Sequence, residues 1–369
     1  MGLKMKLGRD LVRDLERLLF KHSRYAVRYR YILPRVAQNY FRLLVLRRQV
    51  LRGVEFALTY DCNCDCGHCS AAHLRDSRRK PLALETIREA FRECLELGAL
   101  NINLTGGEVL IRRDLDELVR AARPRQCVVS VATNGILLDR NRAARLKKLG
   151  VRIVTISLDS ADPEVHDRSR SHPGCYQRVF EAVEHARDAG LEVFLCTIMT
   201  PENLKNGDIY RMVSLAAEKG VTLTVNVSCA VGGWKHCKGV LLSQEELANF
   251  DRIVSSPHVR WEGGSNYLKE GCPAGVEKIY ISPYGDVMPC NFTHISFGNV
   301  AEESLAVIWK RMIRTEPFNK IHDRCLVGAN SAFMKEYLGP LESSPRLPVF
   351  YKDHPAFAGE EDREAEGSH

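Results

Sequence analysis

The feature that most constrains the fold is an alternation of short apolar runs and amphipathic stretches between residues 54 and 227. The apolar runs have the length and β-branched content of buried strands, at 54–60, 100–104, 127–132, 152–158, 192–198 and 222–227. Between them, apolar residues recur at three- and four-residue spacing, which indicates helices at 84–97, 115–122, 140–149, 177–189 and 209–219. Repeated βα units predict an α/β fold with a parallel sheet. Closed or partly closed barrels and doubly wound sheets both fit this pattern.

The two ends of the 369-residue chain differ from this central region. Residues 1–53 hold 14 Lys/Arg against three Asp/Glu, so they carry a net charge of +11 in a chain whose total is +7. The start of this basic arm has one apolar helical face, formed by Leu3, Leu7, Leu11, Leu15 and Leu18. We therefore expect a helical arm at 1–53, a βα domain at 54–240, a smaller α+β region at 241–340 and a mobile Pro- and acid-rich tail at 341–369.

The basic arm allows three interpretations. Packing on the rest of the chain, with Arg stems covering apolar surface, is favoured. Contact with an anionic membrane surface or an amphiphilic substrate comes second. Nucleic acid is not expected, because no aromatic-basic motif specific to it is present. The chain has no run of about 18 uncharged apolar residues and no apolar signal core before its first charges. The predicted location is cytoplasmic, or peripheral at the inner membrane surface if the arm binds lipid.

The chain contains 13 cysteines, and several of them cluster. Without a secretory signal, clustered cysteines indicate metal or redox chemistry before disulfides. The segment TYDCNCDCGHCS follows the first predicted strand and contains Cys62, Cys66 and Cys69, with Cys64 inside the run. Zinc usually takes four ligands in two separated pairs, and a second C-x2-C pair is missing from the sequence. Three thiolates from one loop favour an iron–sulfur cluster with one open iron; zinc with Cys64 as fourth ligand is the alternative.

The spacing Cys62-x3-Cys66-x2-Cys69 after a first strand resembles the radical S-adenosylmethionine (radical SAM) superfamily. The resemblance implies a partial (β/α)6 TIM-like barrel, in which the three cysteines hold a 4Fe–4S cluster and the fourth iron binds S-adenosylmethionine (SAM). It also implies SAM contacts at the carboxyl ends of the strands, where barrel enzymes place their chemistry. These cofactor-binding candidates are His68 near the adenine, Gly106, Gly107 and Glu108 near the amino group, Thr133 and Asn134 after the third strand, Ser157 and Asp159 near the ribose, and Arg170 near the carboxylate.

A second set of cysteines lies in the C-terminal region. Cys272, Cys290 and Cys325 resemble the auxiliary-cluster extension of radical SAM enzymes, in its SPASM and shorter twitch forms. The additional cysteines of a full SPASM pattern are absent after Cys290, so the twitch form with one auxiliary iron–sulfur cluster fits better. His322 stands where that form places a further cysteine, and His can ligate iron in such centres. We therefore predict His322 as the fourth ligand, with Asp323, another side chain or an open iron as alternatives.

The resemblance implies an enzyme. A one-electron reductant such as flavodoxin or ferredoxin would drive cleavage of SAM to a 5′-deoxyadenosyl radical. That radical would abstract hydrogen from an unactivated carbon of a peptide, a sugar or other natural product, a cofactor precursor or a lipid-like molecule. Cys229 and Cys237, in the loop after the sixth strand, are candidate catalytic thiols, whereas core positions are expected for Cys94, Cys127 and Cys196. The competing class is a non-catalytic iron–sulfur or zinc protein of electron transfer or cluster assembly, which has no use for a SAM pocket.

Overall fold

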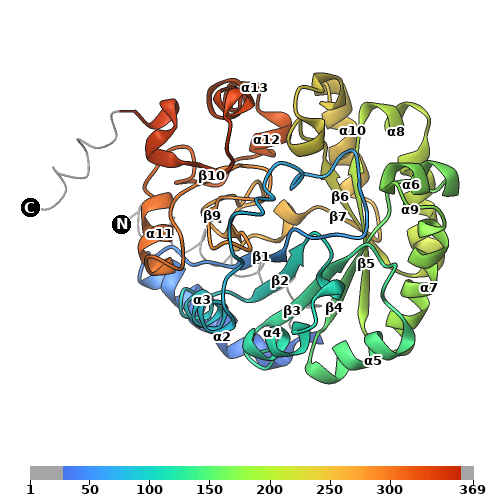
Figure 1. Cartoon of the computed structure of the whole chain (residues 1–369), viewed down its shortest axis with the longest axis horizontal. Coiled ribbons are helices and arrows are strands. Elements are labelled where there is room, and N and C mark those ends of the chain that lie inside the picture. The colour runs from blue at the N-terminus through green and yellow to red at the C-terminus, as the bar shows by residue number, and fades with distance from the viewer. Residues whose placement is uncertain (1–27, 359–369) are drawn as a thin grey trace, which may run out of the picture.

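The computed structural model describes residues 28–358, so the leucine repeat at the start of the arm lies outside the described residues. Nine strands form one sheet in the order β7-β6-β5-β4-β3-β2-β1-β8-β9 (Figure 1). Six neighbouring parallel strands follow chain order: β1 (Gly53–Thr59), β2 (Asn101–Gly106), β3 (Val128–Thr133), β4 (Ile153–Ser157), β5 (Glu192–Met199) and β6 (Thr222–Val227). Because a doubly wound sheet reverses its strand order part-way, this sequential order confirms the partial barrel.

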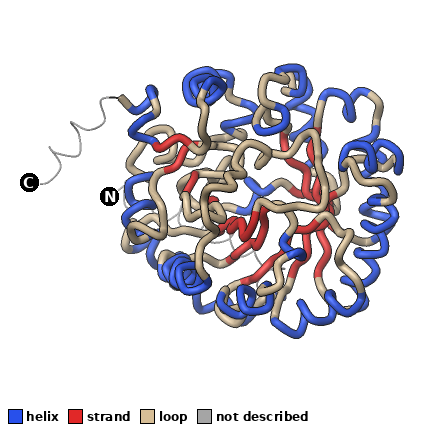
Figure 2. Tube along the Cα trace, viewed as in Figure 1, coloured by secondary structure: helices blue, strands red, loops and turns tan. Residues whose placement is uncertain are grey.

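Helices cover the outside of this sheet, as Figure 2 shows. The predicted helices are α3 (Leu84–Glu96), α4 (Leu115–Ala121), α5 (Arg140–Leu149), α7 (Cys175–Asp188) and α9 (Asp208–Lys219). Phe56 on β1 and Phe91 on α3 meet in the layer between strands and helices, with ring centroids 4.9 Å apart. Glu55, next to Phe56, lines the barrel interior instead, because successive strand side chains face opposite sides.

Two short helices of the barrel domain were not predicted. α6 (Pro163–Arg170) begins after Asp162, whose carboxylate accepts hydrogen bonds from the first turn, and α8 (Pro201–Lys205) begins after a Thr200 capping box. Each has Pro in its first turn, where the fixed φ of Pro favours a helix start. The sequence therefore carried a start signal for both helices, but each is too short to show a convincing apolar period.

Residues 28–52 close the amino-terminal end of the barrel. They form η1 (Arg30–Ile32), α2 (Leu33–Tyr40) and the π-helical turn η2 (Phe41–Val45). Tyr29 and Ile32 are buried against side chains from the first residues of β3 and β4 and from β5, namely Val128, Ile153 and Phe194. The Asn39 amide donates to the Gly98 carbonyl at 2.7 Å and to the Tyr267 hydroxyl at 2.6 Å. This described part of the arm is therefore packed on the barrel.

The C-terminal region continues the barrel sheet. Its helices and strands are α10 (Gln244–Val254), β7 (Val259–Arg260), β8 (Lys278–Ile281), β9 (Val287–Met288), β10 (Ile295–Ser296), α11 (Leu305–Met312), α12 (Leu326–Ala329), α13 (Ser331–Phe333) and β11 (Val349–Phe350). β8 pairs in parallel with β1, with Gly53 opposite Lys278, and β9 turns back antiparallel to β8. The strand that leads to the Cys62 loop therefore has β2 on one side and the C-terminal region on the other.

The expectation of a mobile tail from residue 341 was wrong for residues 341–358. β11 pairs with β10, and the ring of Tyr351 stacks on Phe297 with centroids 5.0 Å apart. Phe357 is 4% exposed in the same aromatic cluster. Burial of these aromatic rings fixes a segment whose Pro and polar content suggested mobility. Within residues 28–358, no helix combines the length and the apolar character needed to cross a bilayer.

Candidate active site

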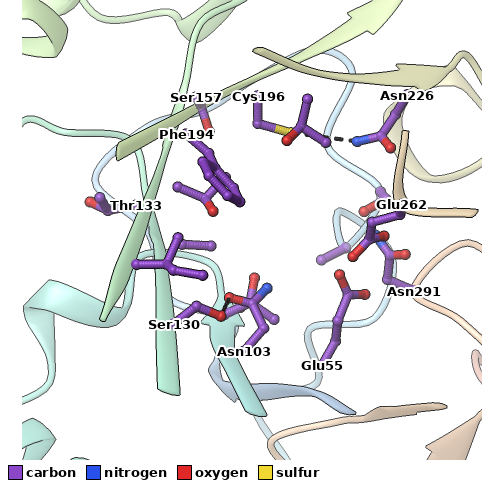
Figure 3. A pocket seen from close by; sticks show the side chains of 18 of the residues that line it. Glu55, Asn103, Ser130, Thr133, Ser157, Phe194, Cys196, Asn226, Glu262 and Asn291 are labelled. Atoms are coloured by element: carbon purple, nitrogen blue, oxygen red, sulfur yellow. Dashed lines mark hydrogen bonds between the residues drawn. The ribbon is translucent and has the colours of Figure 1, made fainter. Parts of the chain in front are cut away.

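The barrel encloses a cavity of 660 Å³. The loop after β1 and the carboxyl ends of the strands form one end of the cavity, and Ile32, Leu33 and Val36 of the arm form the other. Polar side chains from successive strands point into the space between these ends (Figure 3). Part of residues 28–52 is thus the floor of the cavity.

The cysteine loop forms the wall of the cavity at the carboxyl ends of the strands. Cys62, Cys64, Cys66 and Cys69 all line it, and the Cys69 amide donates to the Cys66 carbonyl at 3.1 Å in a tight turn. Among residues 28–358, no three His, Cys, Asp or Glu side chains gather closely enough to hold a single metal ion. A cluster of several irons and sulfides places its thiolates around a larger body than one ion does. Cys62, Cys66 and Cys69 lie in one loop beside the cavity, as the ligands of an iron–sulfur cluster would.

Cys64 differs from its neighbours in proton affinity. A hydrogen-bonding contact with the Cys64 thiol lowers the pKa of Cys62 to about 6 and also lowers the pKa of Cys66, whereas burial raises the pKa of Cys69. Contacts with Cys175, Cys62 and Cys66 raise the pKa of Cys64, whose single S–H proton is donated to one of these sulfurs at a time. Cys62 and Cys66 thus favour the thiolate form that binds iron, whereas Cys64 keeps its proton. Cys175 begins α7 and carries no sequence signal for this position.

Gly106 and Gly107 let the end of β2 pack directly against the cysteine loop. A Cβ at Gly106 would lie 2.1 Å from the Thr59 carbonyl oxygen, and one at Gly107 would lie 2.2 Å from that of Asp61. The Gly107 amide donates to Thr59 at 2.7 Å. The close approach that these glycines allow is thus made to the backbone of the cysteine loop, although both residues also line the cavity. The two glycines therefore determine how closely the start of the cysteine loop packs against the end of β2.

Glu108 has a different position from the one predicted. It is fully buried and does not line the cavity. Its carboxylate accepts from the Thr133 hydroxyl at 2.9 Å and from the amides of Asn134 at 2.8 Å and Leu110 at 2.9 Å. Burial raises the pKa of Glu108 to about 7. The carboxylate oxygens are directed toward the end of β3, and the contact of Glu108 with the amino group of SAM stays a prediction.

Glu108 thereby orients a residue that does face the cavity. The side-chain amide of Asn134 donates to the Asn63 side chain at 2.7 Å and lies 3.4 Å from the Cys64 sulfur. Both Thr133 and Asn134 line the cavity. Hydrogen bonds therefore connect the end of β3 to Glu108 on one side and to the cysteine loop on the other.

A charged group connects β4 and α6 to the cysteine loop. Asp159 bonds to Arg170 and to the Ser169 hydroxyl, and its carboxylate lies 3.6 Å from His68. Burial by itself raises the pKa of Asp159, but Arg170 and His68 outweigh it and hold the pKa at about 2. Arg170 also approaches the Cys66 sulfur at 3.8 Å. The predicted residues His68, Asp159 and Arg170 thus meet at one wall of the cavity, which Ser157 extends.

Sequence reasoning missed the polar interior of the barrel. Asn103, Ser130 and Asn226 project inward from β2, β3 and β6, and Glu55 and Glu262 lie together on another wall (Figure 3). Cys196, expected in the core, lines the cavity as well, and the Asn226 amide lies 3.4 Å from its sulfur. The available signal was the presence of polar residues at alternate positions of otherwise apolar strands, since these positions share one face.

Lys278 joins the two interior carboxylates. Its ammonium lies 3.0 Å from Glu55 and also bonds to Glu262. Burial raises the pKa of Glu55, which the positive charge of Lys278 only partly opposes. The second carboxylate oxygen of Glu55, Oε2, is buried without a hydrogen-bond partner in the described part of the chain. The cavity therefore contains a carboxyl oxygen whose hydrogen-bonding capacity its neighbours leave unsatisfied.

Comparison with known proteins identifies the family. Residues 56–213 match the family model of the Radical SAM superfamily, and residues 272–327 match SPASM, an iron–sulfur cluster-binding domain. The PqqA peptide cyclase of Granulibacter bethesdensis is 30% identical over 275 residues, covering 70% of this chain and 73% of the cyclase. The chain belongs to the radical SAM superfamily. Its cofactors are accordingly a 4Fe–4S cluster, SAM and an auxiliary iron–sulfur cluster.

Two further comparisons show a curated relative and a solved structure that this chain resembles. The AdoMet-dependent heme synthase of Methanosarcina barkeri is 26% identical over 306 residues, covering 74% of this chain and 85% of the synthase. The crystal structure of Streptococcus suis SuiB bound to precursor peptide SuiA has a TM-score of 0.60 at 18% identity, covering 76% of this chain and 69% of SuiB. The structural likeness shows a shared fold over 76% of this chain.

The auxiliary cysteines lie near the carboxyl end of β6. Cys272 precedes β8, Cys290 follows β9 and Cys325 precedes α12. Each thiol accepts at least one backbone hydrogen bond, from Ala274 and Leu326, from Phe292, and from Val327 and Gly328, respectively. Hydrogen bonds to sulfur are a common means of tuning iron–sulfur clusters. The three predicted auxiliary ligands therefore fit such a cluster.

The remaining predicted residues do not take their expected positions. Neither Cys229 nor Cys237 lines the cavity: Cys229 is buried behind the end of β6, and Cys237 is exposed on its loop. The His322 side chain bonds through Nε2 to the Pro317 carbonyl at 2.7 Å. It is thus engaged within its own turn and is not directed as an iron ligand.

Proposed function

We propose that this radical SAM enzyme cleaves SAM reductively and abstracts a hydrogen atom from an unactivated carbon of a substrate held in the barrel. One observation carries the proposal: the cysteine loop, the residues expected to contact SAM apart from Glu108, and the polar interior line one cavity of 660 Å³. An electron carrier needs a cluster near its surface but no enclosed chamber beside it. The cofactor supplies the radical chemistry, while the protein positions the reactants and excludes water.

Each residue has a proposed task. Cys62, Cys66 and Cys69 would hold the cluster, and a flavodoxin- or ferredoxin-like reductant would supply its electron. Arg170 is held by Asp159 at the wall beside Cys66, where its charge suits the SAM carboxylate. The other proposed SAM contacts all face the cavity, namely His68, Gly106, Gly107, Thr133, Asn134 and Ser157. Glu108 acts through Asn134 as a positioning residue.

We further propose that the substrate carries an amino or hydroxyl group that reaches Glu55. The unsatisfied oxygen of this buried carboxylate supports the assignment, because a buried acceptor without a donor costs about 1–3 kcal/mol. Glu262 and Asn226 add further acceptors around the same space. Relatives include a cyclase of the PqqA peptide and a structure bound to the SuiA precursor peptide. A peptide with a free amine or a side-chain hydroxyl meets this requirement.

The decisive experiment is anaerobic incubation of the reconstituted protein with SAM and dithionite. We expect 5′-deoxyadenosine to form, and Cys66→Ala to abolish it. Cys237→Ala is the matched control, because Cys237 is exposed and lies outside the cavity. An intact cluster that yields no 5′-deoxyadenosine would instead identify an electron-transfer or assembly protein. A substrate is then recognised by transfer of its deuterium into 5′-deoxyadenosine.

A second candidate property is contact with an anionic membrane surface. Phe41, Val45 and Leu46 are 53%, 62% and 45% exposed on and beside the π-helical turn, and Arg42, Arg47 and Arg48 lie in the same segment. Exposed apolar side chains beside basic ones are typical of interfacial segments. We expect full-length protein to float with anionic vesicles, and the triple serine variant of Phe41, Val45 and Leu46 to float less. Equal flotation of the two proteins would remove this property. A truncation is unsuitable because α2 closes the barrel.

A further inference from the structure

A fourth thiol lies with the auxiliary cysteines. Cys229 comes two residues after the end of β6, in the barrel domain, and is 5% exposed. Its thiol shares a hydrogen bond with the thiol of Cys325 and interacts electrostatically with Cys290 and Cys272. Four cysteine side chains from four separate segments thus lie near one another, with Cys229 and Cys272 buried and Cys290 and Cys325 half-buried. The match to the SPASM domain begins only at residue 272 and does not include Cys229.

The backbone is shaped to bring Cys229 and Cys325 together. A Cβ at Gly328, three residues after Cys325, would lie 2.6 Å from the Ser228 carbonyl oxygen and 3.2 Å from the Cys229 sulfur. A larger residue at Gly328 would therefore separate α12 from the end of β6. The hydroxyl of Ser228 donates to the Val240 carbonyl, which anchors the same turn from its other side. The contact between the two thiols thus follows from tight packing of two backbone segments.

The residues expected to complete the auxiliary site point elsewhere. His322 contributes its backbone, since its carbonyl accepts from the Cys272 amide at 2.6 Å, while its ring bonds to Pro317. Asp323 is 84% exposed and pairs with Lys269 at 2.7 Å. Neither side chain faces the three auxiliary thiols, whereas Cys229 does.

We propose that Cys229 is the fourth protein ligand of the auxiliary cluster, together with Cys272, Cys290 and Cys325. Four thiolates complete the ligation of a 4Fe–4S cluster, so no iron is left open to bind a substrate atom. The auxiliary cluster therefore serves electron transfer and does not anchor the substrate. Its position suits this role, because Asn291 and Phe292, the two residues after Cys290, line the cavity. The ligand assignment rests on the presence of the auxiliary cluster and is independent of the substrate proposed above.

The proposal also changes how the two regions are joined. β6 belongs to the barrel, and the other three cysteines belong to the C-terminal region. A cluster ligated by Cys229 crosslinks the two regions beside the cavity. We therefore expect loss of the cluster to loosen this contact as well as to remove a redox centre.

The test isolates the auxiliary cluster in the full-length chain. Replacing Cys62, Cys66 and Cys69 by Ala removes the SAM-binding cluster, so the remaining iron and its electron paramagnetic resonance signal report the auxiliary site alone. In this background, Cys229→Ser and Cys229→Ala are compared with His322→Ala. Cys237→Ala is the matched control, because it removes an exposed thiol from the same loop. Circular dichroism and thermal melting of each variant separate loss of ligation from loss of folding.

We expect both Cys229 variants to lose about one iron per auxiliary cluster, or the whole cluster, and to change the spectrum of the reduced centre. His322→Ala and Cys237→Ala should match the triple-alanine parent in both measurements. Unchanged iron content and spectrum in folded Cys229→Ser protein would overturn the assignment. So would a change confined to His322→Ala. Formation of 5′-deoxyadenosine by protein with intact Cys62, Cys66 and Cys69 tests the proposed reaction separately.

Discussion

Gly107→Ala should damage the active site without placing any group in the cavity. The added Cβ would lie 2.2 Å from the Asp61 carbonyl oxygen, whereas real Cβ contacts are not shorter than 3.0 Å. The backbone at Asp61 must therefore move by about 1 Å, and Cys62 is the next residue. Overpacking of this kind costs about 1–3 kcal/mol. A misplacement of about 1 Å near reacting groups lowers the rate about 100-fold.

The control for this substitution is Gly53→Ala. Gly53 begins β1, the strand that leads to the same loop, and an added Cβ there meets no atom within 4 Å. The assay measures iron content after anaerobic reconstitution, the rate of 5′-deoxyadenosine formation and unfolding in urea. We expect Gly53→Ala to resemble the unmodified protein and Gly107→Ala to lose most of the rate. Equal rates in the two variants would refute the argument that Gly107 sets the position of the cysteine loop.

Three further predictions follow from buried polar groups. Burial lowers the pKa of His294 to about 4 from 6.5, so the folded state binds fewer protons than the unfolded state between these pH values. The unfolding free energy should therefore fall by about 2 kcal/mol from pH 7 to pH 5. A His294→Gln protein whose unfolding free energy falls equally over this pH range would contradict the prediction. Asn39→Ala removes the bonds to Gly98 and Tyr267 and should cost about 1–3 kcal/mol in urea unfolding; a loss below about 0.5 kcal/mol would show that α2 is held by other contacts. Asp159→Asn leaves Arg170 without its charged partner. Equilibrium dialysis should then show SAM binding about tenfold weaker, which is equivalent to about 1.4 kcal/mol. Unchanged SAM affinity would remove Asp159 from the proposed site.

The local pattern of the barrel could be predicted because each unit is specified by nearby residues. β6 and α5 have the predicted bounds, and the other five barrel strands differ from prediction by one or two residues at an end. The cysteine spacing and its position after β1 likewise predicted the family, which the comparisons confirm. Apolar periodicity and short motifs are properties of contiguous sequence, so they can be recognised without knowledge of the tertiary structure.

The roles of Glu108 and Cys196 could not be predicted in the same way. The sequence places Glu108 directly after two glycines, but its side chain is directed away from the cavity to the end of β3. Cys196 lies in an apolar strand, and only closure of the barrel exposes it to the interior. Which face of a strand borders a cavity depends on the partners of that strand, and these partners lie far away in the chain.

The amino-acid sequence by itself determined the βα units, the loop that carries Cys62, Cys66 and Cys69, and the presence of a second cysteine set. The tertiary structure decided which distant groups complete each site. Pairing of β8 with β1 brings the C-terminal region beside the barrel, and packing of Gly328 on Ser228 brings Cys229 to Cys325, 96 residues later in the chain. Local spacing does not encode such contacts, because they form only when a long intervening segment folds and its burial offsets the entropy of closing the loop.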